Sequence, residues 1–101
     1  MSIVELTPEQ NRIAFKVASA ALAEIGAIVE PDYRTGKAAT RRIGTCDRYR
    51  ATVLGYRAAG VAVPSVADWV EWEDRHAKRP TVDEEAELHR IHLMLTGEVA
   101  A

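Results

Sequence analysis

Helix start signals recur along this chain and constrain its fold more than any other feature. Three segments begin with Ser or Thr and carry an acidic or amide side chain three residues later: Thr7–Gln10, Ser65–Asp68 and Thr81–Glu84. The hydroxyl of such a residue accepts a hydrogen bond from a free amide of the first helical turn, and the second side chain can return one. Together with a fourth segment of helical character, these signals predict an all-α fold.

The four expected helices span about residues 8–25, 46–59, 65–78 and 81–97. Gly26, Gly60 and Gly97 follow three of them, and Pro80 follows the remaining one. Glycine commonly ends a helix because it adopts a left-handed backbone at no steric cost, whereas proline cannot continue one. Thr45 is the expected N-cap of the second helix.

The first expected helix is apolar on nearly every side. Its polar stripe holds only Arg12, Lys16 and Ser19, and alanine and larger apolar residues occupy the rest. A helix of this kind is buried nearly all round. We therefore expect a compact bundle of about four helices around an Ala-rich, mostly buried first helix. The alternative is that residues 8–25 lie partly in a homodimer interface.

A chain of 101 residues fits one domain, 1–101. Residues 27–44 show turn chemistry and no helical period, so we expect an irregular basic loop between the first two helices. A short helix over residues 37–43, or a short extended pairing of residues 27–30 with 61–63, are the alternatives for this part of the chain.

Charge is unevenly distributed, although the net formal charge is only -2. Residues 34–57 carry seven cations and one acid, Asp47, whereas the flanking segments are acidic. Five of the arginines form a candidate partner-binding electrostatic face: Arg41, Arg42, Arg48, Arg50 and Arg57. Arginine suits planar contacts with carboxylate or phosphate. The competing interpretation is that the acidic third and fourth helices neutralise this segment within the fold.

Residues 51–70 also resemble a helix-turn-helix, in which the second helix reads the major groove. Here that helix would present Asp68, Glu71, Glu73 and Asp74, which phosphates repel. The basic segment is the better candidate if nucleic acid is bound.

Trp69 and Trp72 lie one turn apart on the third expected helix and are either core residues or anchors for a partner. Glu73 falls within the same apolar region. A carboxylate there needs a cation or solvent, so we expect it at the rim, paired with an arginine of the second helix.

No catalytic constellation stands out. His89 and His92 are spaced so that they could share a metal, but a polar flank beside the apolar stripe of the fourth helix explains them better, so we expect no metal and no cofactor. Cys46 lies near a helix start beside arginines, which can activate a thiol, yet no surrounding motif resembles a thiol enzyme. We expect that the protein is not an enzyme.

The single cysteine excludes an intramolecular disulfide and favours a reducing cytoplasm. Residues 1–8 lack a basic start, so we expect no signal peptide, and no apolar run is long enough to span a bilayer.

The sequence thus favours a small non-enzymatic cytoplasmic interaction protein: a regulator, adaptor or inhibitor, including the phage- or accessory-element-encoded kind, that binds another protein or complex. The alternative is a nucleic-acid-binding regulator that uses residues 34–57 and is dimeric through residues 8–25.

Overall fold

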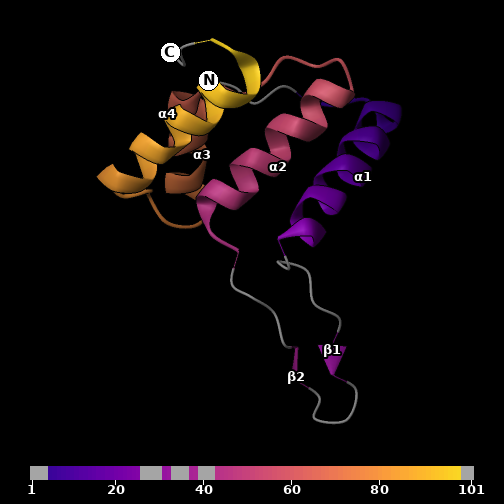
Figure 1. Ribbon diagram of the computed structural model, residues 1–101, viewed down its shortest axis with the longest axis horizontal. Coiled ribbons are helices and arrows are strands. Elements are labelled where there is room, and N and C mark those ends of the chain that lie inside the picture. Colours follow the sequence, from indigo (N-terminus) through magenta and orange to yellow (C-terminus); the bar gives the residue numbers. More distant parts are fainter. Residues whose placement is uncertain (1–4, 26–30, 33–36, 39–42, 99–101) are drawn as a thin grey trace.

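A computed structural model describes residues 5–25, 31–32, 37–38 and 43–98 of the chain. Its elements in order are α1 (Pro8–Glu24), β1 (Pro31–Asp32), β2 (Lys37–Ala38), α2 (Thr45–Ala58), α3 (Val66–His76) and α4 (Val82–Thr96) (Figure 1). The all-α prediction is confirmed, because four helices make up the body of the molecule.

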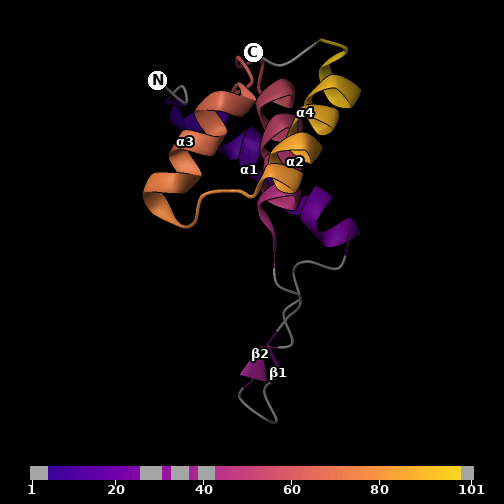
Figure 2. The ribbon, with the colours of Figure 1, turned by 90° about the vertical axis from the view of Figure 1, so that its left-hand side faces the viewer.

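The connection between α1 and α2 differs from the predicted irregular loop. Its two short strands pair antiparallel, with Pro31 opposite Ala38 and Asp32 opposite Lys37. The pair projects away from the helices (Figure 2). Residues 27–30, which an alternative paired with residues 61–63, lie outside the described residues, as does most of the alternative helix over residues 37–43.

Three of the four predicted helix caps form. Thr7 and Gln10 exchange side-chain-to-backbone hydrogen bonds of 3.2 and 3.0 Å at the start of α1, and Thr81 and Glu84 do the same at α4. The Ser65 hydroxyl accepts from the Asp68 amide at 3.1 Å. These local bonds explain why the helix boundaries follow the sequence signals so closely.

The start of α2 departs from the expectation. Its N-cap is Gly44, which offers no side chain, and Thr45 is already the first helical residue. Thr45 is buried, and its hydroxyl hydrogen-bonds to side chains of α3 instead of to the first turn of its own helix. Thr45 therefore makes tertiary hydrogen bonds to α3 in place of the predicted capping bond.

The central helix is α2, not α1. It packs against α1 on one side and against α4 on the other, and α3 packs against α4 (Figures 1 and 2). The main cluster of buried side chains joins α2 to α3 and α4: Tyr49, Val53, Val66, Trp69, Val70, Leu88 and Ile91.

The prediction that α1 is mostly buried is wrong. Only Ala14 and Ala21 are buried on this helix, and Phe15 is 72% exposed. The physical reason is that α1 packs chiefly on one neighbour, α2. Because α1 is apolar on several faces and α2 covers only one of them, the others stay exposed. The Ala-rich composition serves a close contact between two helices rather than enclosure by three.

Gly55 marks a close approach of α1 to α2. A Cβ atom on this residue would lie 2.5 Å from the carbonyl oxygen of Ala14. Backbone cannot move aside as a flexible side chain does, so only glycine permits this contact.

We predict that Gly55→Ala destabilises the fold by about 1–3 kcal/mol, since the clash outweighs the better helix propensity of alanine. Thermal unfolding measures the loss. Hydrogen exchange locates it: amides of α1 should exchange faster, while those of α4 keep their protection. A Gly55→Ala protein as stable as the wild type would contradict the packing described.

Candidate functional site

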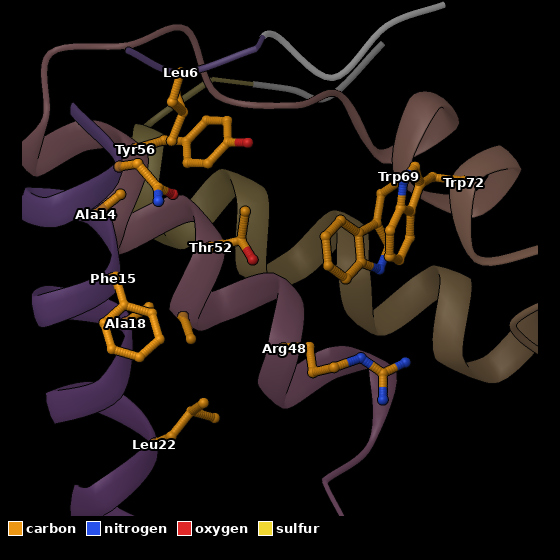
Figure 3. Close-up of a pocket in the computed structure, with 12 residues that line it drawn as sticks. Leu6, Ala14, Phe15, Ala18, Leu22, Arg48, Thr52, Tyr56, Trp69 and Trp72 are labelled. Carbon is orange, nitrogen blue, oxygen red and sulfur yellow. The ribbon is translucent and has the colours of Figure 1, made fainter. Parts of the chain in front are cut away.

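An apolar groove of about 420 Å³ lies between α1 and α3, with α2 as its floor (Figure 3). Its walls and floor are formed by residues of the N-terminal segment and three helices: Leu6, Asn11, Ala14, Phe15, Ala18, Leu22, Arg48, Ala51, Thr52, Tyr56, Trp69 and Trp72. The volume falls within the range of ordinary ligand and peptide sites. Three helices therefore build a concave apolar surface on a chain of only 101 residues.

One wall is a stripe along α1. Asn11, Phe15, Ala18 and Leu22 are spaced by four, three and four residues, which places them on one helix face. This face adjoins the one that packs on α2 through Ala14 and Ala21. Thus α1 has two neighbouring apolar faces, and α2 covers one of them.

The opposite wall is aromatic. Trp69 packs against Tyr49 in the core with a ring separation of 5.2 Å, and Trp72 stacks on Trp69 at 5.9 Å. His76 stacks on the outer side of Trp72 at 4.4 Å. Trp69 is 5% exposed and Trp72 is 39% exposed. The structure therefore makes Trp69 a core residue and leaves Trp72 at the surface of the groove.

The floor carries two hydroxyl groups among apolar atoms. Within the described part of the chain, neither Thr52 nor Tyr56 uses its hydroxyl in a hydrogen bond, and Tyr56 points across the groove in Figure 3. Burial raises the pKa of the Tyr56 phenol, so it stays a neutral donor and acceptor at physiological pH. Such groups can fix the orientation of an apolar ligand.

Glu73 is fully buried and joins α3 to the first turn of α2. Its Oε1 accepts from Arg48 Nη2 at 2.5 Å and from the Thr45 hydroxyl at 3.1 Å. The indole N–H of Trp69 donates to the same hydroxyl at 2.9 Å. The predicted pairing with an arginine of the second helix is confirmed, but the predicted rim position is wrong.

Both terminal nitrogens of the Arg48 guanidinium donate hydrogen bonds in this network. Its Nη1 donates to the Ile43 carbonyl at 3.0 Å, while Nη2 holds Glu73. Arg48 thus closes one end of the groove as a structural cation, and its side chain remains 39% exposed. The second carboxylate oxygen of Glu73 is buried with no hydrogen-bond partner in the described structure.

We predict that Arg48→Met destabilises the protein by about 3 kcal/mol, because it leaves a buried carboxylate without its cation. The double variant Arg48→Met, Glu73→Met should recover most of that loss, since a buried ion pair is often replaceable by apolar side chains of similar size. Urea unfolding of the three proteins measures both effects. A double variant no more stable than Arg48→Met would contradict the pairing.

The other arginines of the predicted electrostatic face are distributed differently. Arg41 and Arg42 lie outside the described residues. At about 100° per residue, Arg50 and Arg57 share one side of α2, and Arg48 lies on the opposite side, which lines the groove. The helix therefore does not bring these three arginines together.

Intramolecular neutralisation of the basic segment is limited in the described residues. Glu71, Asp74 and Glu87 pair with cations close in sequence, namely Arg75, Arg79 and Arg90. Across the described ranges, Arg48–Glu73 is the one ion pair that links α2 to the acidic helices. Arg50 and Arg57 form none with described residues.

The histidines of α4 do not converge. His89 is exposed, whereas His92 is buried with Nδ1 3.2 Å from the Thr96 hydroxyl. No group of three or more metal-ligating side chains occurs among the residues that the structure describes.

The thiol of Cys46 is not activated by its helix position. Burial, followed by the nearby carboxylates Glu84, Glu87 and Asp47, raises its pKa. Its Sγ lies 3.7 Å from the Glu84 carbonyl oxygen, to which it can donate.

Comparison of the chain with protein-family models, with curated proteins and with solved structures gave no match. Among its described helices, none combines the length and apolar character needed to cross a bilayer.

The sequence predicts Trp72 as a core residue or an anchor, but it does not predict Phe15, Leu22 and Tyr56 as site residues. A signal for Phe15 and Leu22 lies in the breadth of apolar surface on α1, because a helix that is apolar on two neighbouring faces needs two packing partners. Tyr56 belongs to α2 and carries no such signal.

Proposed function

We propose that the protein is a non-enzymatic binding protein that takes the apolar face of a helix from another polypeptide into its groove. It would act as a regulator, adaptor or inhibitor. The observation that carries this proposal is the pair of exposed aromatic side chains, Phe15 and Trp72, on opposite walls of a groove floored by α2.

The chemistry of the groove suits a helix better than a polar ligand. Its lining is apolar except for Asn11, Arg48 and the Thr52 and Tyr56 hydroxyls. Amphipathic helices commonly bind in such grooves with apolar anchors spaced by three or four residues. Tryptophan is the side chain most often decisive for affinity at such surfaces, which favours Trp72 as the principal contact.

The compartment is part of the proposal. A chain with one cysteine, half-buried and with a raised thiol pKa, suits the reducing cytoplasm.

Site-specific photocrosslinking in cells tests the groove. A photoreactive phenylalanine analogue at position 15 should form a defined polypeptide adduct, whereas the same analogue at position 94 should not. Met94 is the matched control because it is 75% exposed on α4, away from the groove.

The captured polypeptide is then purified and its affinity measured. Trp72→Ala should weaken binding by at least about 10-fold, as truncation of an anchoring Trp does. Equal crosslinking from positions 15 and 94, or an affinity unchanged by Trp72→Ala, would contradict the proposal.

A second candidate function is nucleic-acid binding through the outer side of α2. It is favoured by Arg50 and Arg57, which share that side and have no ion-pair partner among described residues. Titration with DNA and RNA at about 50 and 200 mM salt decides it. Salt-sensitive binding that Arg50→Glu, Arg57→Glu removes would support this function, and no binding at the lower salt would exclude it.

A further inference from the structure

We infer that the helix occupying the groove is α1 of a second copy of this chain, in a twofold-symmetric homodimer. This inference rests on the proposed function, because it assigns the occupant of the same groove. The two helices would lie antiparallel, each filling the space between α1 and α3 of the other chain.

Self-complementarity is the first argument. The uncovered stripe on α1 is itself one wall of the groove, so two copies present identical patches to each other, as a twofold interface requires. Ala18 lies in the middle of the stripe, with Phe15 three residues before it and Leu22 four residues after it. In an antiparallel pairing centred between Ala18 and Ser19, Phe15 of each chain meets Leu22 of the other, and the small residues at the centre let the helices approach.

Much of the apolar stripe on α1 is left uncovered in the single chain, which is the second argument. Only Ala14 and Ala21 of α1 are buried, whereas Phe15 is exposed and Leu22 is partly exposed. Exposed apolar faces of this kind mark interaction surfaces. A second α1 is an apolar helix of matching length that the chain itself supplies.

Charge complementarity is the third argument. A helix seated in the groove touches α1 with one side and α3 with the other. On α1 the side turned away from the Phe15 stripe carries the exposed Lys16, which has no ion pair with a described residue. The margin of α3 beside Trp72 carries Asp68, which likewise has none. The second copy thus brings an unpaired cation to an unpaired carboxylate.

The side of α2 that carries Arg50 and Arg57 lies about 180° from the side that floors the groove. Dimerisation through the groove would therefore leave this side available for another partner.

Sedimentation equilibrium of the purified full chain, from about 1 µM to about 1 mM, is the primary test. The wild type should shift with concentration from the 11.1-kDa monomer to twice that mass. Phe15→Glu should raise the dimer dissociation constant at least 10-fold, and Met94→Glu should leave it unchanged. Both side chains are exposed, and circular dichroism verifies that each variant keeps its helices.

Charge reversal tests the orientation. Lys16→Glu and Asp68→Lys should each weaken association, and the double variant should restore it toward the wild-type value. Lys78→Glu, an exposed cation outside the groove, is the control.

Three results would overturn the inference. The protein could stay monomeric at every concentration, its dimer dissociation constant could be unaffected by Phe15→Glu, or the double charge variant could associate more weakly than both single variants. The proposed function would survive such a result if the photoreactive residue at position 15 still captures a different polypeptide whose binding requires Trp72. If position 15 captures neither a second copy nor another polypeptide, the proposed function fails as well.

Discussion

The fully buried carboxylate of Glu73 ties α3 to the start of α2. A buried charge needs hydrogen-bond donors, and the two donors to this carboxylate in the described structure, Thr45 and Arg48, both come from the first turn of α2. Because Trp69 also donates to Thr45, the start of α2 is fixed to the middle of α3. That attachment places Trp72, one turn further along α3, at the edge of the groove.

The attachment of α1 is of a different kind. It depends on the close approach of Ala14 to Gly55 and involves small residues, so it buries little of the larger apolar surface of α1. Since α3 and α4 pack with the opposite side of α2, no further helix reaches the stripe that includes Phe15. The groove therefore exists because α1 and the α3–α4 pair pack on different sides of α2 and leave a space between α1 and α3.

Local signals were sufficient to predict the helices, because capping pairs such as Thr81 and Glu84 act within four residues. They could not predict which helix is central. The position of α2 depends on contacts between residues far apart in the sequence, above all the hydrogen bond that Thr45 donates to Glu73. Electrostatics predicts the pairing of Glu73 with an arginine of α2. Its full burial belongs to a tertiary contact that the sequence does not reveal, in which Thr45 donates to the carboxylate and Trp69 donates to Thr45. The groove itself does not follow from the sequence, which predicts either a first helix covered within the bundle or one that lies partly in a homodimer interface.

An NMR dilution series that follows the Trp72 indole N–H and the methyl groups of Ala18 and Leu22 tests whether two copies associate through the groove. Concentration-dependent shifts should concentrate on these groups, while Met94 and the core methyls of Leu88 remain unchanged. An absence of concentration-dependent shifts, or shifts that are confined to α4 or spread evenly over the surface, would contradict this association.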